Sequence, residues 1–229
     1  MTDVVDGLEP VDGKHTVRVC IGAQAYEISR EAVAELGLRL GCAVGPEVRV
    51  QLEAAADRRS AAALVLRYLR GRPRTEHQVR AKLQSQGVGE AAIESVIADL
   101  VRQGVVDDAR YAVAFVAARL AHRPTGAMRL RRELVARGVP RPLAAAAAGR
   151  AAPGDELAAA LAAGRPRVAA ARRLGGERGR HRLALFLRRR GFTTADALAA
   201  CRVLLDANAA PDGPAAASAE AHAPPAAAP

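Results

Sequence analysis

The chain has 229 residues, half of them apolar but only 3% aromatic, and it carries 34 basic and 24 acidic side chains. No apolar run is long enough to span a membrane. Its three cysteines are too far apart for a zinc site or a disulfide framework. We therefore expect a reduced, cytoplasmic protein, whose core is built from Leu, Val, Ile and Ala and which needs no metal or other cofactor.

The basic charge is concentrated in the middle of the chain. Residues 1–55 have a net charge of −4 and residues 209–229 of −2, whereas residues 56–208 hold 29 basic and 13 acidic side chains. Such an excess indicates a polyanionic partner, either nucleic acid or an acidic protein surface. Genome composition would explain why only Lys14 and Lys82 are lysines, but it does not explain why the excess lies in the middle.

The N-terminal part reads as a short tail and a small mixed segment. Residues 1–14 are acidic and predicted to be disordered, and a hairpin/helix segment follows over residues 15–57. Within it, residues 16–29 alternate apolar and polar side chains around a possible turn at 22–24, which predicts a β-hairpin. Ser29 is a plausible N-cap for a short helix from about Arg30 to Leu36, and Pro46 suits the first turn of another.

From about residue 58 the apolar pattern becomes helical. Ala61, Leu64, Val65, Tyr68 and Leu69 share one face of a predicted helix. Thr75 is placed to cap the next helix, with Gln78 in the partner position of a capping box. A third helix follows and ends at Gly104.

The same unit then recurs. Leu83-x-x-x-Gly87-Val88 is echoed by Leu134-x-x-x-Gly138-Val139 and by Leu187-x-x-x-Gly191-Phe192, at spacings of 51 and 53 residues. Each glycine suits a helix end that needs a left-handed residue. We therefore predict a mainly α fold, an elongated tandem array of three-helix repeats over residues 58–105, 106–152 and 153–208. The alternative is unrelated helices that share a common ending.

Two stretches of this array are glycine- or alanine-rich. Residues 175–179 are expected to form a flexible connection inside the third repeat. Residues 209–229 are Ala and Pro with little else, so a disordered tail is expected there.

No constellation in the sequence predicts an enzyme. Asp107 and Asp108 are the most suggestive acidic pair, but no other carboxylate or histidine is placed by spacing to converge on them. Two carboxylates that open a helix more often cap its backbone N–H groups and complement its dipole. There is no phosphate-binding loop of the G-x-x-x-x-G-K-[ST] type. We expect no catalytic, metal or cofactor residues, and structural caps at Thr75, Asp107 and Asp108.

The basic side chains of the middle helices and of the loop before the first of them are the candidate partner-binding residues. Guanidinium groups suit both phosphates and carboxylates, so the sequence leaves both DNA and an acidic protein surface open. An ordinary solvated helix face is the third possibility. The candidates are Arg72, Arg74, Arg80, Lys82, Arg129, Arg131, Arg132, Arg137, Arg182, Arg188, Arg189 and Arg190.

Several segments resemble one known family. Residues 66–69 with 72–76, and residues 104–112, are similar to the characteristic stretches of RecX repeats. Residues 123–126 and 187–192 are similar to parts of the later repeats, whereas the Ala-rich residues 158–171 and the glycines at 175–179 depart from the pattern. The resemblance covers about residues 58–206.

The RecX resemblance implies a fold and a function. It implies tandem three-helix repeats without enzymatic activity. It also implies binding to RecA filaments on single-stranded DNA, with suppression of RecA activities in DNA repair, recombination and the SOS response; some members of the family bind DNA as well. We expect a monomer that does not bind membranes. The alternative function is a sequence-independent DNA-binding module built from helix-turn-helix-like units.

Overall fold

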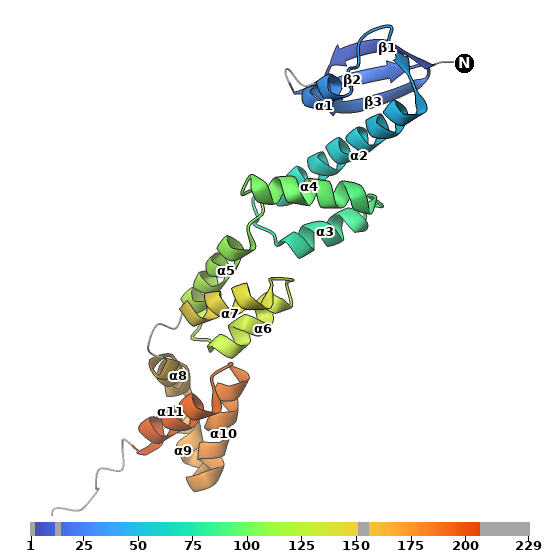
Figure 1. The fold of residues 1–229 in the computed structure, drawn as a ribbon. Coiled ribbons are helices and arrows are strands. Elements are labelled where there is room, and N and C mark those ends of the chain that lie inside the picture. Colours follow the sequence, from blue (N-terminus) through green and yellow to red (C-terminus); the bar gives the residue numbers. More distant parts are fainter. Residues whose placement is uncertain (1–2, 12–14, 151–155, 207–229) are drawn as a thin grey trace, which may run out of the picture.

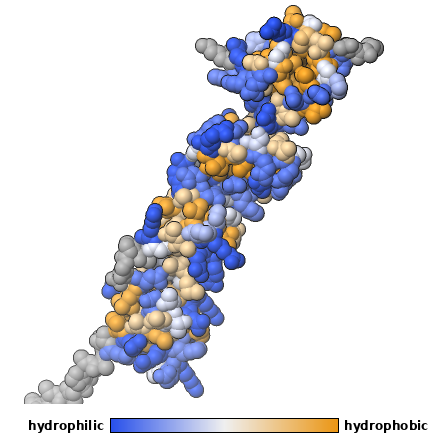
Figure 2. All heavy atoms as spheres, in the orientation of Figure 1, coloured by the Kyte–Doolittle hydropathy of each residue, from blue (hydrophilic) through white to orange (hydrophobic). Residues whose placement is uncertain are grey.

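The computed structural model describes residues 3–11, 15–150 and 156–206. In this part of the chain a small β-domain is followed by three helical units stacked in one direction, which makes the molecule elongated (Figure 1). The β-domain and each unit have a hydrophobic cluster of their own. On the face drawn in Figure 2, the apolar residues accordingly gather in separate patches along the array. The predicted fold class, a mainly helical tandem array with a small N-terminal β segment, is confirmed.

The β-domain is a four-stranded antiparallel sheet in the order β3-β2-β1-β4. Its strands are β1 (Asp3–Pro10), β2 (Thr16–Ile21), β3 (Gln24–Ser29) and β4 (Ala43–Val44). The short helix α1 (Arg30–Glu35) follows β3, and the Ser29 hydroxyl caps it by accepting from the N–H of Ala32 at 3.1 Å. The β2–β3 pair and α1 are the hairpin and helix that the sequence predicts.

The expected disorder of residues 1–14 is wrong for β1. This strand pairs with β2 from Val5 to Pro10 and with β4 through Asp3 and Val4. The Val5 side chain is buried in the sheet core. Pairing on both edges orders this acidic segment, although its own sequence lacks a local apolar pattern. Residues 1–2 and 12–14 lie outside the described part of the chain.

One long helix joins the β-domain to the first unit. Helix α2 (Pro46–Leu69) contributes Leu52 and Ala55 to the core of the β-domain. Its second half contributes Ala61 and Val65 to the core of the first unit. The predicted boundary between residues 57 and 58 therefore falls inside a helix. The helix continues because no glycine or proline interrupts residues 47–70.

The first two units are built alike. The second half of α2 packs with α3 (Glu76–Gln84) and α4 (Glu90–Arg102). In the second unit α5 (Asp108–His122) packs with α6 (Ala127–Val135) and α7 (Arg141–Arg150).

The recurring glycines end the middle helices as the sequence predicts. Gly87, Gly138 and Gly191 have φ of 75°, 86° and 92°. After each glycine, the next N–H donates to a carbonyl five residues back, as in Val139 to Leu134 at 3.2 Å. This is the hydrogen bond of a Schellman motif, and it turns the apolar residue after the glycine back toward the helix.

The third unit departs from the predicted three helices. It contains α8 (Glu156–Gly164), a 3-10 turn η1 (Arg165–Arg167), α9 (Val168–Leu174), α10 (Gly176–Arg189) and α11 (Thr194–Asp206). Helices α8, α10 and α11 correspond to α5, α6 and α7, and α9 is additional. The Ala-rich stretch is divided because η1 contains Pro166 in its first turn and Gly175, at φ 68°, ends α9.

The flexible connection expected at residues 175–179 is also wrong. Residues 176–179 form the first turn of α10. Gly179 allows α10 to touch α9, because a Cβ there would lie 2.1 Å from the carbonyl oxygen of Ala171. The tail expected at 209–229 lies outside the described residues.

Candidate partner-binding surface

The middle helices of the three units are stacked end to end. The Thr75 hydroxyl at the start of α3 donates to the carbonyl of Arg137, just after α6, at 2.7 Å. The N–H of Gly126 at the start of α6 donates to the carbonyl of Arg190, just after α10, at 3.0 Å. Each junction therefore brings the carbonyl end of one helix to the amide end of another. Opposite ends of two helix dipoles meet there, which is the favourable orientation.

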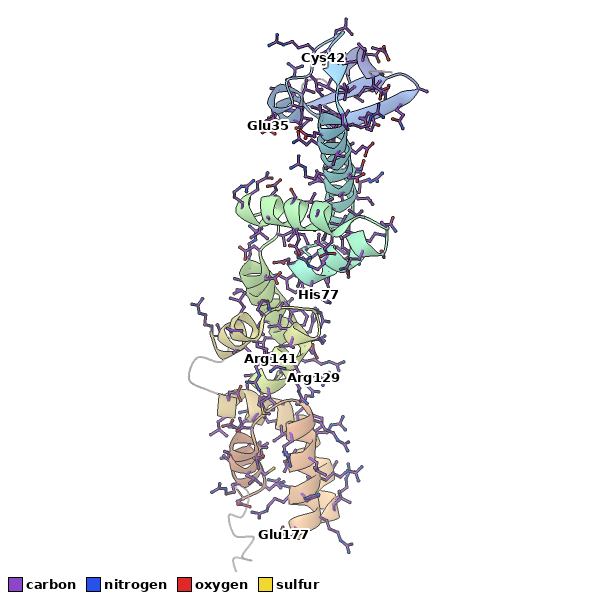
Figure 3. The ribbon with its side chains drawn as sticks, turned by 45° about the vertical axis from the view of Figure 1, so that its right-hand side comes forward. Glu35, Cys42, His77, Arg129, Arg141 and Glu177 are labelled. Atoms are coloured by element: carbon purple, nitrogen blue, oxygen red, sulfur yellow. The ribbon has the colours of Figure 1, made fainter. Side chains whose placement is uncertain are left out.

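Gly138 and Gly191, at the two junctions, are required not only for their positive φ but also because a side chain would have no room there. A Cβ on Gly138 would lie 2.1 Å from Cβ of His77, and a Cβ on Gly191 would lie 2.3 Å from Cβ of Arg129. Figure 3 labels His77 and Arg129 at these two places in the array. The glycine that ends each of these helices thus also allows the preceding unit to approach closely.

At each junction, a carboxylate from the following unit caps the start of the middle helix, α3 or α6. Asp108, the first residue of α5, accepts a hydrogen bond from the N–H of Glu76 at 2.9 Å. Glu156, the first residue of α8, accepts one from the N–H of Ala127 at the same distance. The sequence places Asp108 as a cap for its own helix, whereas the backbone group that it satisfies belongs to α3. Burial, above all, raises the pKa of Asp108.

The other caps act within their own helices. Thr75 and Gln78 form the full capping box at the start of α3. The Asp107 carboxylate accepts from the N–H of Arg110 at 2.8 Å at the start of α5. In the part of the chain that the structure describes, no three His, Cys, Asp or Glu side chains are grouped so that they could hold a metal ion. None of the described helices is long and apolar enough to cross a membrane.

Two candidate residues of the first unit are engaged inside the molecule. Arg80 forms ion pairs with Glu94 at 2.6 Å and Glu90 at 2.8 Å, both on α4. The hydrogen bond to Glu94 is the main reason that the pKa of Arg80 is raised. The Arg74 guanidinium lies 4.6 Å from the centre of the Tyr68 ring. These side chains hold α3 and the preceding loop in place.

Two candidates of the second unit are similarly engaged around Glu133. Arg129 donates to this carboxylate at 2.8 Å, and Arg119 donates to it from α5. Burial alone would raise the pKa of Glu133, but the hydrogen bonds and the positive charges of these two arginines together outweigh it and lower the pKa. Arg137 donates to the Glu133 carbonyl at 2.7 Å and lies 4.4 Å from the centre of the Phe115 ring.

Arginines also gather at the junction between the second and third units. The pKa of Arg190 is lowered by burial and then by repulsion from Arg123, Arg129 and Arg167. Arg190 donates to the carbonyl of Pro124 at 3.1 Å. Arg123 and Arg167 were not among the predicted residues. The signal that could have identified Arg123 is the arginine content of the loop before the middle helix, which also holds Arg72 and Arg74 in the first unit. Arg167 lies in η1, before the additional helix α9, and no repeat pattern marks it.

The remaining candidates face solvent. They are exposed or half-buried, and none has a hydrogen bond or ion pair from its side chain to another described residue. These are Arg72, Lys82, Arg131, Arg132, Arg182, Arg188 and Arg189. The five of them that lie on α6 and α10 are all exposed, along helices that follow one another in the stack. Together these residues are called the arginine surface below.

The fold and its junctions define a class of protein: a linear array of three-helix units whose middle helices stack end to end and carry arginine. Two family models match in this region, the RecX first three-helix domain at residues 61–100 and the RecX second three-helix domain at residues 107–147. A regulatory protein RecX from Thermobifida fusca is 35% identical over 147 residues, which cover 64% of this chain and 80% of that protein. The chain belongs to the RecX family.

Other relatives agree over shorter stretches. The regulatory protein RecX of Halalkalibacterium halodurans is 30% identical over 115 residues, which are half of this chain but only 43% of that longer protein. A crystal structure of regulatory protein RecX superposes with a TM-score of 0.73 at 18% identity, covering 85% of this chain and 96% of that one. RecX from Lactobacillus salivarius superposes at 0.59 and 19% identity, covering 65% of this chain and 96% of that one. At these identities the two structures establish the fold.

Proposed function

We propose that the protein binds RecA filaments on single-stranded DNA and inhibits RecA recombination, ATP hydrolysis and coprotease activity in DNA repair and the SOS response. The relatives are named as regulatory proteins, and the RecX domains are the matched part of this chain. In this proposal the protein has no catalytic activity of its own, acts as a monomer in the cytoplasm and needs no cofactor.

The observation that carries the proposal is the arginine surface on stacked helices. A filament presents a repeating polyanionic or acidic groove, and a linear array can follow such a groove over several units. Arg131 and Arg132 on α6, and Arg188 on α10, are exposed and unpaired in the described part of the chain. Guanidinium groups can bind either DNA phosphates or acidic side chains in such a groove.

The test is RecA ATPase activity on single-stranded DNA, with and without this protein. We expect inhibition at protein concentrations well below that of RecA. Reversing both Arg131 and Arg132 to Glu should abolish most of it. Reversing both Arg141 and Arg150 to Glu, two exposed sites at the start and end of α7, serves as the charge-matched control. Unchanged ATPase activity at equimolar protein would refute the proposal.

Direct DNA binding is the second candidate function, and the same arginine surface favours it. Sequence-independent binding would occur without RecA and weaken steeply with salt. If the Arg131/Arg132 reversal abolishes inhibition but leaves naked-DNA binding intact, these residues contact RecA. If both fall together, they contact DNA.

A further inference from the structure

The third unit contains a groove that the first two units lack. It lies between α9 and α10 and has a volume of about 830 Å³. Leu174, Leu185 and Phe186 form part of its apolar lining, and Arg173, Arg182 and Arg189 form part of its basic lining. In Figure 1 these two helices lie at the far end of the array from the sheet.

The groove exists because of the additional helix. In the first two units, the start of the middle helix is covered by the next unit, through Arg137 and Arg190. The start of α10 is instead covered by α9, which approaches it at Gly179. The groove is therefore a feature of this end of the array, although Arg182 and Arg189 belong to the arginine surface as well.

The charge of the groove is one-sided. Among the described residues that line it, several are arginines, one is His181 and none is acidic. Glu177, labelled in Figure 3 at the start of α10, is not part of the lining. The guanidinium groups of Arg173, Arg182 and Arg189 are exposed and have no carboxylate partner in the described chain. Cations beside an apolar wall attract anions more strongly than fully solvated ones do.

The apolar lining decides between two kinds of anion. Leu174 is 44% exposed and Leu185 is 36% exposed, so both can still bury surface against a ligand. The Phe186 ring is already contacted by Arg167 at 5.2 Å and Arg190 at 5.0 Å from its centre. Single-stranded nucleic acid binds by stacking bases on free aromatic rings, whereas aliphatic side chains flanked by arginine suit an acidic peptide with apolar side chains.

We propose that the groove between α9 and α10 binds an acidic peptide segment that carries large apolar side chains. Glu or Asp carboxylates pair with Arg173, Arg182 and Arg189, and Leu- or Phe-like side chains pack on Leu174 and Leu185. This goes beyond the regulation of RecA, because the site is confined to the third unit and can be tested with peptides alone.

The experiment measures fluorescence anisotropy of a short labelled peptide titrated with the full chain. The peptide places Glu on one side and Leu and Phe on the other at helical spacing. Three probes of equal length serve as comparisons: one with Ser in place of Leu and Phe, one with Gln in place of Glu, and an oligo-dT. We expect the first peptide to bind more tightly than all three.

Paired variants locate the site. Arg173→Glu should weaken binding by about tenfold or more, since it replaces an attraction with a repulsion, and Leu174→Gln should weaken it several-fold. Arg202→Glu and Leu198→Gln are the controls, because both residues are similarly exposed on α11 and lie outside the groove. Circular dichroism spectra that match the wild type confirm that all four variants are folded.

Three results would overturn the proposal. Oligo-dT could bind more tightly than the peptide and be lost in Arg173→Glu, which would make the groove a nucleic-acid site. The Ser-substituted peptide could bind as tightly as the parent, which would leave charge as the only determinant. The peptide could also bind equally well to Arg173→Glu and to Arg202→Glu, which would place it elsewhere.

Discussion

Replacing Asp108 tests whether the units are held together by the cap that one unit supplies to the preceding unit. Its carboxylate accepts the N–H of Glu76 from the neighbouring unit at 2.9 Å in a partly buried site. Asp108→Ala leaves that N–H without an acceptor, which should cost about 1–2 kcal/mol. For a protein of this size this corresponds to a melting temperature lower by about 2–8 °C. Asp108→Asn keeps an acceptor oxygen and should lose much less.

The pH dependence separates the hydrogen bond from the charge. Burial raises the pKa of Asp108 in the folded protein, so the folded state binds this proton more tightly than the unfolded state does. The resulting stabilisation is complete below the unfolded pKa and is lost as the pH rises through the folded pKa. Relative to Asp108→Asn, the wild type should therefore gain stability as the pH falls through that raised pKa.

Hydrogen exchange gives the local readout, because an array of separate cores need not unfold in one step. Faster exchange is expected first at the start of α3 in Asp108→Ala. Asp107→Ala is the comparison, since Asp107 caps only α5, through the N–H of Arg110. Equal losses of stability in Asp108→Asn and Asp108→Ala would show that the charge of the carboxylate matters and that a neutral acceptor oxygen for the Glu76 N–H does not. Full stability of Asp108→Ala would show that this contact contributes nothing to the junction.

Three further perturbations address the core, the junction and the surface. Leu187→Ala removes a fully buried side chain and should cost about 2–5 kcal/mol of stability. Amide hydrogen exchange should become faster in the third unit only, and a uniform increase along the array would contradict the separate cores. Gly191→Ala places a side chain at φ 92°, with its Cβ 2.3 Å from that of Arg129. We expect a loss of stability of more than about 1 kcal/mol in thermal unfolding, and an unchanged unfolding midpoint would contradict the close approach. The Arg131/Arg132 reversal to Glu should keep the wild-type melting temperature within about 2 °C, since exposed sites rarely carry stability, and a large drop would show that these residues have structural partners.

The repeat could be predicted because its signals are local. Gly87, Gly138 and Gly191 each follow a leucine by four residues, and each has the left-handed φ that this ending requires. Helical periodicity and capping residues act over a few positions, so the sequence displays them directly. The same reasoning placed Ser29 and Thr75 at the starts of α1 and α3.

The missed features depend on contacts between distant positions. Strand β1 is ordered by pairing with β2 and with β4, which lies more than 30 residues away. Asp108 looks like a cap for its own helix because its neighbour Asp107 is one, and only the stacking of units shows its real partner. Arg80 looks like a free cation on α3 until α4 places Glu90 and Glu94 beside it. The residue pattern of one helix does not show which charged side chains a neighbouring helix places beside it.

Each junction has a carbonyl acceptor at the end of one helix and a carboxylate cap from the following unit. The two junctions differ in charge, and this difference bears on where a polyanion would bind. At the first junction the nearby Arg74 stacks on Tyr68 and Arg80 is neutralised by glutamates. At the second, burial and then repulsion from Arg123, Arg129 and Arg167 lower the pKa of Arg190, and of these three Arg129 is paired with Glu133. An anion at the first junction would compete with the two glutamates that hold Arg80. An anion at the second would meet one paired arginine, Arg129, and would relieve the repulsion on Arg190. For this reason we expect a polyanionic partner of the arginine surface to contact the second junction in preference to the first.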